Sequence, residues 1–304
     1  MFKKGEFPEL VEVALKHHPE IAGMQGVVEK ELLHCELLHA LDRGGWLDRL
    51  TFQGGSALRL CYGASRLSED LVFSAAPRFS IESMADLSAC LRKVLSGRGI
   101  GMEVESPKAK TSHTTSGTGV CTWRIVCEVL PLNNGIPKQR INLDIDNAPT
   151  YAGGPGAITH NYGVVPESRM LVLAQSREEI LARKIATFAI SVATRSCPRF
   201  RDIWDMNWLM GNGTAIRDDL VSAKMNDYCV EQSWLETVAA SVRDIIYSAE
   251  FSKEMRRLLP PKISVQTLDK PYYLEFLTNE TERLFRKHSS CVSEPLNLDR
   301  SALN

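Results

Sequence analysis

A short segment in the first third of the chain has the residue types of a phosphate-binding site. Gly54, Gly55 and Ser56 follow a β-rich run at 50–52 and open an apolar helix that stops at Gly63. Two glycines let a ligand approach the backbone closely, and Ser56 adds a hydroxyl among the unpaired amides at the positive end of the helix dipole. The segment therefore predicts a turn whose three residues bind the phosphates of a nucleotide.

A carboxylate follows this turn at a distance along the chain that suits a metal ion. Asp70 comes fourteen residues after Ser56 and begins the strand-like run Asp70-Leu71-Val72-Phe73. Mg²⁺ prefers oxygen ligands and commonly binds one or two carboxylates together with substrate phosphates, and Mn²⁺ accepts the same ligands. A carboxylate beside a phosphate-binding turn predicts a nucleotide site that depends on Mg²⁺ or Mn²⁺.

A second run of carboxylates alternates with aliphatic residues between Arg140 and Asp146. Side chains two apart in a strand point to the same side, so Asn142, Asp144 and Asp146 share one face and three aliphatic residues share the other. The polar face has two interpretations. It provides a ligand to the site, or it is the solvent-facing side of a half-buried strand.

A lysine lies within the apolar arc of a later helix. The capping box at 176–179 opens this helix, which continues to about Ala193. Lys184 has Ile180 and Phe188 four residues away on either side, and an ammonium in such a place is costly unless an anion meets it. Either Lys184 contacts an anionic ligand such as a triphosphate, or its side chain extends along the helix surface to water.

Two further aspartates lie on the next helix. On a helical wheel Asp202 and Asp205 are on the side opposite Ile203 and Trp204. The residues alone therefore predict that both aspartates face solvent.

Two blocks of these residues resemble the AbiEii/AbiGii nucleotidyltransferase toxins, members of the polymerase-β-like superfamily. Residues 54–73 contain the Gly-Ser turn and Ser-Glu-Asp before an alternating strand, and residues 178–205 contain Glu-Glu-Ile-Leu-Ala-x-Lys and Arg-Asp-x-x-Asp. The resemblance covers about residues 28–209. It implies an α+β fold, with a polymerase-β-like nucleotidyltransferase core whose mixed β-sheet is flanked by helices, plus a C-terminal helical region.

The resemblance also implies roles for individual residues. Asp70 is the implied first metal ligand, with Asp144 on a neighbouring strand and Asp146 close behind it as candidates for a further one. Lys184 is implied to contact a nucleoside triphosphate. Asp202 and Asp205 are implied either to pair with Lys184 or to position the site, and we count these three with Asp70 as candidate catalytic residues.

The family further implies a reaction and partners. Metal-assisted attack of an acceptor hydroxyl on the α-phosphate of a nucleoside triphosphate transfers a nucleoside monophosphate to RNA and releases pyrophosphate. Members act as toxins of type IV toxin-antitoxin or abortive-infection (phage-defence) systems, and some modify the acceptor end of tRNA. The usual partner is a winged-helix antitoxin that also represses transcription.

One position departs from the family pattern. The family has Asp-x-Asp, whereas here Asp70 is followed by Val72, which alternation along the strand places where the second metal ligand belongs. Three interpretations stay open. The chain catalyses transfer with its other carboxylates, it is a catalytically disabled nucleotide- or antitoxin-binding protein, or Val72 is a disarming change in a toxin that harms its expression host.

Composition limits the partners and the cellular location. The 304 residues are 44% apolar and 24% charged, with a formal net charge of −1. A near-neutral chain does not coat nucleic acid as a whole, so contact with RNA must come from a local basic patch. Eight scattered cysteines without a close pair suggest neither a zinc site nor a disulfide framework. With no membrane-length apolar run, we expect a cytoplasmic protein without a membrane partner.

The length of 304 residues suggests two domains, or one core with a helical extension. We predict a nucleotidyltransferase core at residues 1–150 and a mainly helical domain at 151–304, which carries the Lys184 and Asp202/Asp205 elements. The segment 150–162 is rich in glycine and proline, which indicates a linker. Further strands are predicted near 101–105, 120–130, 139–146 and 170–173, and further helices at 26–43, 80–95, 231–248 and 272–287.

Overall fold

The molecule is built around one mixed β-sheet flanked by helices. The structure, a computed structural model, describes residues 7–75, 81–107, 120–129, 138–163, 170–194 and 197–291. In these ranges the sheet has seven strands in the order β3-β4-β5-β2-β1-β7-β6. Their bounds are β1 Leu50–Gln53, β2 Leu71–Ala75, β3 Ile100–Glu105, β4 Val120–Val129, β5 Gln139–Asp146, β6 Gly153–Ala157 and β7 Leu171–Gln175. The predicted α+β class is confirmed.

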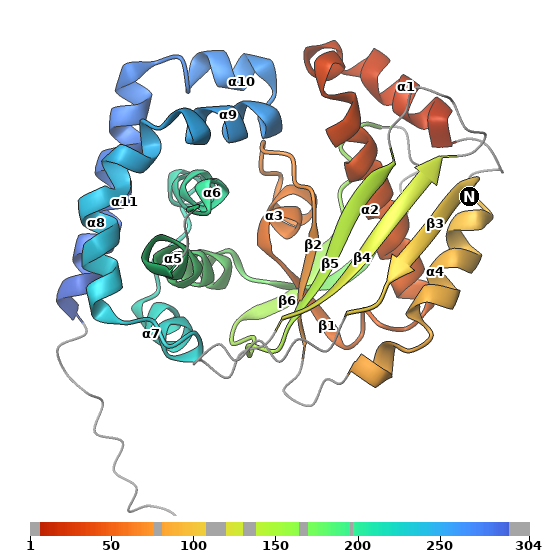
Figure 1. Ribbon diagram of the computed structural model, residues 1–304, viewed down its shortest axis with the longest axis horizontal. Helices are drawn as coiled ribbons and strands as arrows, with labels where there is room; N and C mark the ends of the chain where they lie inside the picture. Colours follow the sequence, from red (N-terminus) through yellow and green to blue (C-terminus); the bar gives the residue numbers. More distant parts are fainter. Residues whose placement is uncertain are drawn as a thin grey trace, which may run out of the picture.

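Helices account for most of the rest of the described chain. The α-helices are α1 Phe7–His17, α2 Gln25–Arg43, α3 Gly54–Tyr62, α4 Leu87–Ser96, α5 Arg177–Thr194, α6 Phe200–Gly211, α7 Asp218–Asp227, α8 Gln232–Ile246, α9 Ala249–Leu258, α10 Pro261–Gln266 and α11 Pro271–Cys291. Two 3-10 helices, η1 Pro19–Met24 and η2 Ile81–Met84, precede α2 and α4. In Figure 1, α2 and α4 lie against the β3–β5 part of the sheet, whereas α5 to α11 form a group at the other end of the molecule.

The strand pairing brings the two carboxylate-bearing segments together. β2 pairs with β5 in parallel and with β1 in antiparallel register, while β4 and β5 are antiparallel. On one face of these strands the side chains are aliphatic and aromatic and are fully buried, as Phe73, Leu143 and Ile125 illustrate. The opposite face carries the polar residues that the alternating pattern predicts, so burial of the apolar face fixes the register that aligns the polar one.

The predicted linker is wrong at residues 153–157, which form strand β6 at the edge of the sheet. Pro155 is tolerated there because an edge strand does not need every N–H for pairing. A Cβ at Gly153 would lie 2.6 Å from the carbonyl oxygen of Ala174, so a side chain does not fit. The glycines and the proline thus reflect close strand packing, and the predicted domain boundary near residue 150 stays a prediction.

The C-terminal helices form their own packed layer. The apolar side of α5 contacts α6, α7 and α8, and α11 packs on α6 and α8. Aromatic contacts connect these helices, with ring centroids 5.8 Å apart for Phe188 and Phe285 and 6.1 Å apart for Phe200 and Phe251. In the described part of the chain, no helix combines the length and the apolar character needed to cross a membrane.

Candidate active site

Asp70 and Asp144 lie on neighbouring strands and face the same side of the sheet. Asp70 immediately precedes β2, and Asp144 lies in β5, opposite Val72 in the parallel register. The backbone N–H of Asn142 donates to Oδ1 of Asp70 at 3.1 Å, and the hydroxyl of Thr122 donates to Oδ1 of Asp144 at 2.7 Å. Both aspartates are half-buried. We call them the carboxylate pair.

Nearby cations do not fully balance the negative charge of the carboxylate pair. Burial raises the pKa of Asp144, the hydrogen bond from Thr122 opposes this, and the negative charge of Asp70 raises the pKa further. The charges of Arg183 and Arg199 lower it without cancelling the effect. A divalent cation would relieve this repulsion, and two carboxylates supply the oxygen ligands that Mg²⁺ and Mn²⁺ prefer. The residues therefore fit one such ion.

Val72 stands between the carboxylate pair and the glycine turn. It is paired with Asp144 on one side and with Gln53 on the other. A Cβ at Gly54 would lie 3.4 Å from the Cβ of Val72, and Gly54 has a φ of +76° that favours glycine. An isopropyl group therefore stands at the position where the resemblance implies a second aspartate. In the described residues, no three His, Cys, Asp or Glu side chains gather to hold a metal.

The predicted phosphate turn forms the start of α3, but its serine is used within the protein. Ser56 is buried, its hydroxyl donates to the carbonyl oxygen of Asp70, and it lies 2.9 Å from the hydroxyl of Ser68. A Cβ at Gly55 would lie 2.4 Å from the guanidinium of Arg66. Ser56 thus fixes the turn relative to Asp70, and the backbone amides of Gly54 and Gly55 remain as the groups suited to phosphate.

Lys184, Asp202 and Asp205 come together with two arginines in what we call the buried ion-pair cluster. The Nζ of Lys184 lies 2.8 Å from Asp202 and 2.7 Å from Asp205. Arg66 donates two hydrogen bonds to Asp205, at 2.8 and 2.7 Å. Arg199 donates through Nε to Asp202 at 2.8 Å, and its side chain is 45% exposed. The other four residues are buried.

The contacts in the cluster keep its carboxylates ionised. Burial raises the pKa of Asp202, but the charges of Arg199 and Lys184 outweigh it and hold the pKa below the usual range. Asp205 behaves in the same way because Arg66 and Lys184 oppose the effect of burial. Each buried charge has an opposite partner, which is the condition under which buried ions are tolerated.

One expectation about the aspartates of this cluster, and one of the two interpretations of Lys184, are wrong. Asp202 and Asp205 do not face solvent, because α6 is covered by α5, α9 and α11, and a helical wheel does not show what covers its polar side. Lys184 does not extend to water, since only 5% of it is exposed. The anions that meet Lys184 are the two aspartates, as one of the family-based alternatives implied. A catalytic role for any of the three stays a prediction.

Asp146 is held by other groups. It is buried, and its Oδ2 accepts hydrogen bonds from Arg183 at 3.0 Å and from the hydroxyl of Tyr228 at 2.5 Å. Its Oδ1 accepts from the N–H of Ala148 at 2.8 Å. These contacts occupy both oxygens, so the geometry does not favour the predicted role of Asp146 as a metal ligand and instead makes it an anchor between β5 and α5.

Sequence reasoning missed two groups that organise the site. Arg66 lies between the buried residues Ala64 and Leu67, and the signal for it is the same as for Lys184, a cation among apolar residues. Glu69, next to Asp70, pairs with Lys30 at 3.2 Å and also with Arg257. Burial raises the pKa of Glu69, but Arg257 and Lys30 outweigh this and lower it to about 2.

Comparison with known proteins assigns the family. The sequence model described as nucleotidyl transferase AbiEii toxin, type IV toxin-antitoxin system, matches residues 36–279. The chain belongs to the AbiEii family. It is therefore a member of a family of nucleotidyltransferase toxins, and membership implies an antitoxin partner. No curated protein sequence matches the chain significantly.

A solved structure shows the same fold. MenT4, a nucleotidyltransferase toxin from Mycobacterium tuberculosis H37Rv, is similar to this AbiEii-family chain with a TM-score of 0.55 and 17% sequence identity, over 91% of this chain and 89% of that one. JHP933 from Helicobacter pylori matches with a TM-score of 0.47 and 19% identity, over 87% and 95% of the two chains. At these identities the likeness to MenT4 supports the fold alone.

Proposed function

We propose that this AbiEii-family chain transfers a nucleoside monophosphate from a nucleoside triphosphate to an RNA hydroxyl in a Mg²⁺-dependent reaction. The observation that carries the proposal is the placement of Asp70 and Asp144 on one polar face of the sheet, beside the glycine turn that opens α3. The acceptor oxygen bonds to the α-phosphorus, the bond to the bridging oxygen breaks, pyrophosphate leaves and the hydroxyl proton passes to solvent.

The residues around the turn would bind and orient the triphosphate. Asp70 and Asp144 would hold Mg²⁺ or Mn²⁺, which neutralises phosphate charge and aligns attacking and leaving oxygens. The backbone amides of Gly54 and Gly55 would donate to phosphate oxygens at the positive end of the α3 dipole. Because the Ser56 hydroxyl donates to the carbonyl of Asp70, the turn and the carboxylate keep a fixed geometry, which favours reaction by pre-organisation.

Arg199 is the cation of the cluster best placed to meet phosphate. Its Nε is anchored on Asp202, which Lys184 also holds, while nearly half of its side chain is exposed. Its charge acts on Asp144, and a guanidinium edge is well suited to phosphate oxygens. In this arrangement Lys184 acts on the triphosphate through Asp202 and Arg199, as a positioning residue, and not by direct contact.

The acceptor and the biological role follow from the family resemblance. We propose RNA as the acceptor, with the 3′ end of tRNA as its first candidate. The proposed partner is a winged-helix antitoxin that represses transcription, and the proposed setting is abortive infection or phage defence in the cytoplasm.

A second candidate function has one observation in its favour. Val72 fills the place of the second aspartate and contacts both the turn and the strand that carries Asp144. Holding a triphosphate needs fewer ligands than aligning the attacking hydroxyl, so the chain would bind nucleotide or antitoxin without turnover.

The experiment that separates these functions uses the purified protein, each α-labelled triphosphate, Mg²⁺ and total RNA. If the chain transfers nucleotide as proposed, at least one of the labelled triphosphates gives labelled RNA. Asp70→Asn and Asp144→Asn should each remove this signal. Asp48→Asn, on an exposed loop, is the matched control and should leave the signal unchanged. Nucleotide binding with no labelled RNA in any reaction would favour the second function.

A further inference from the structure

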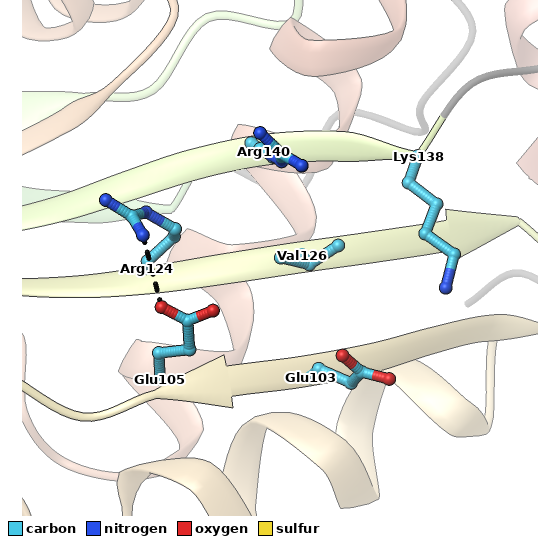
Figure 2. Close-up of a pocket in the computed structure, with 6 residues that line it drawn as sticks. All are labelled: Glu103, Glu105, Arg124, Val126, Lys138 and Arg140. Atoms are coloured by element: carbon cyan, nitrogen blue, oxygen red, sulfur yellow. Dashed lines mark hydrogen bonds and ion pairs between the residues drawn. The ribbon is translucent and has the colours of Figure 1, made fainter.

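The polar face of the sheet continues outward from the carboxylate pair into a hollow. A cavity of about 510 Å³ lies over β3, β4 and β5. Figure 2 shows the lining residues that the structure describes on the three neighbouring strands, with Lys138 directly before β5. They are Glu103, Glu105, Arg124, Val126, Lys138 and Arg140. We call this surface the outer sheet face.

The outer sheet face is continuous with the candidate active site. In β5, Arg140, Asn142 and Asp144 are two residues apart, so their side chains share one face. β4 pairs Val126 with Arg140 and Thr122 with Asp144, which extends the same face to the next strand. Four residues of strand place Arg140 about 13 Å from Asp144, so a bound chain can reach from one to the other.

The face offers cations that a phosphate can engage. Arg140 is exposed, and among the described residues no partner is seen for its guanidinium. Arg124 pairs with Glu105 at 3.2 Å and Lys138 with Glu128 at 3.3 Å. Both lysine and arginine side chains in these pairs are more than half exposed, and exposed ion pairs contribute little free energy. Exchange of a carboxylate partner for a phosphate therefore costs little.

The cationic side chains Arg124, Lys138 and Arg140 of this face are exposed. The opposite face of β4 and β5 carries Trp123, Ile125 and Ile141, which are buried against the helices. Among the described residues that line the outer sheet face, Val126 is the only apolar one, and it is half-buried. Because the whole chain has a net charge of −1, contact with a polyanion depends on such a local group of cations.

We propose that the outer sheet face binds the phosphate backbone of the acceptor RNA and directs its terminal hydroxyl toward Asp144. This inference rests on the proposed function, because it assumes that the acceptor is RNA. Arg124, Lys138 and Arg140 contact phosphates, so they position the RNA without reading its sequence. Glu103 and Glu105 oppose the contact and keep binding weak enough for the product to leave.

The test measures RNA binding separately from transfer. A short fluorescein-labelled single-stranded RNA is titrated with the full chain and its variants at several salt concentrations. Arg140→Ala and Arg124→Ala should each weaken binding roughly two- to fivefold, and each lost phosphate contact should reduce the slope of log K against log salt by about 0.7. Glu105→Gln, which frees Arg124, should strengthen binding.

Matched controls separate a local effect from loss of charge in general. Arg283→Ala removes the same charge from α11, at the far end of the molecule in Figure 1, and should leave RNA affinity unchanged. Arg140→Lys keeps the charge and should retain the salt slope. Nucleotide binding by all variants should equal that of the parent chain, which shows that the fold and the triphosphate site are intact.

The outcomes distinguish this inference from the proposed function. If no form transfers nucleotide, the proposed function is rejected. If RNA binding is then still weakened by Arg140→Ala and not by Arg283→Ala, the RNA-binding face is retained. Equal RNA affinity for the parent, Arg140→Ala and Arg124→Ala would overturn the inference while transfer remained testable. Loss of antitoxin binding in those variants, without loss of RNA binding, would make the face a protein interface and overturn it as well.

Discussion

The carboxylate pair and the buried ion-pair cluster contain the same kinds of side chain in opposite electrostatic situations. Asp70 and Asp144 are half-buried and close to each other, and burial and like charge raise the pKa of Asp144. Asp202 is more deeply buried, yet Arg199 and Lys184 outweigh the effect of burial and its pKa falls. The cations near the carboxylate pair do not cancel the effects of burial and like charge, whereas each carboxylate of the cluster is directly paired with cations of the protein.

The difference indicates where a ligand acts. A complete set of buried ion pairs has no need of an added ion, and removing one partner leaves an uncompensated charge in the interior. A like-charged pair in a half-exposed place is destabilising until a cation or a positively charged ligand reaches it. We therefore expect the cluster to determine stability and the pair to determine ligand binding.

The largest expected effect comes from breaking the cluster. Arg66→Ala leaves Asp205 buried with Lys184 as its remaining partner, and loss of one partner from a buried pair typically costs about 3–5 kcal/mol. Urea unfolding measures the change. Arg283→Ala, at an exposed site, is the control and should change stability by less than about 0.5 kcal/mol. A loss below about 1 kcal/mol for Arg66→Ala would contradict a structural role for the cluster.

A smaller effect should come from filling the carboxylate pair. Mg²⁺ that binds only the folded state at ten times its Kd adds about 1.4 kcal/mol of stability. Thermal unfolding at rising Mg²⁺ measures this, and Asp70→Asn or Asp144→Asn should abolish the response. Asp202→Asn should keep the response even though it lowers stability. A Mg²⁺ response that survives both Asn changes in the pair would place the ion elsewhere.

The smallest effect concerns pH. The folded-state pKa of Asp144 is raised, so the folded state takes up this proton first and repulsion within the pair is relieved as pH falls from 7 toward 4. Asp144→Asn should therefore be more stable than the parent chain at pH 7, by about 0.5 kcal/mol or less, and lose that advantage on acidification. The pKa of Asp202 is lowered, so its ionised carboxylate contributes to stability with the opposite sign. That contribution is present at neutral pH and is lost below about pH 4. A stability advantage of Asp144→Asn that grew as the pH fell would contradict a raised pKa of Asp144 in the folded state.

The sequence predicted the elements of the site better than their surroundings. Alternation in the strand that carries Asp144 and the capping box before Lys184 are local patterns, and local patterns predict single elements well. The same alternation predicted that Val72 shares the polar face of its strand, and the β2–β5 register pairs Val72 with Asp144. The partners of Lys184 and the burial of Asp205 depend on which helices cover α6. Two of those helices, α9 and α11, are distant from α6 in the sequence, so local patterns do not predict the contacts.

Strand β6 is a second case in which the sequence alone does not determine the structure. Glycine and proline between residues 150 and 162 have two physical causes, a flexible connection or close packing at a sheet edge, and composition does not separate them. The contact of Gly153 with the backbone of β7 decides the matter only once the strands are paired.

The most direct test of the central claim changes Val72. The claim is that Asp70 and Asp144 form the catalytic carboxylate pair and that Val72 occupies the place of a further ligand. The rate of Mg²⁺-dependent transfer from labelled triphosphate to RNA is compared for the parent chain, Val72→Asp and Val72→Asn, which matches aspartate in size without its charge. We expect the rate for Val72→Asp to be about tenfold or more above the rates of the other two forms, with growth inhibition in the same order. Equal rates and equal growth inhibition for all three forms would show that position 72 is not a ligand position and would contradict the claim.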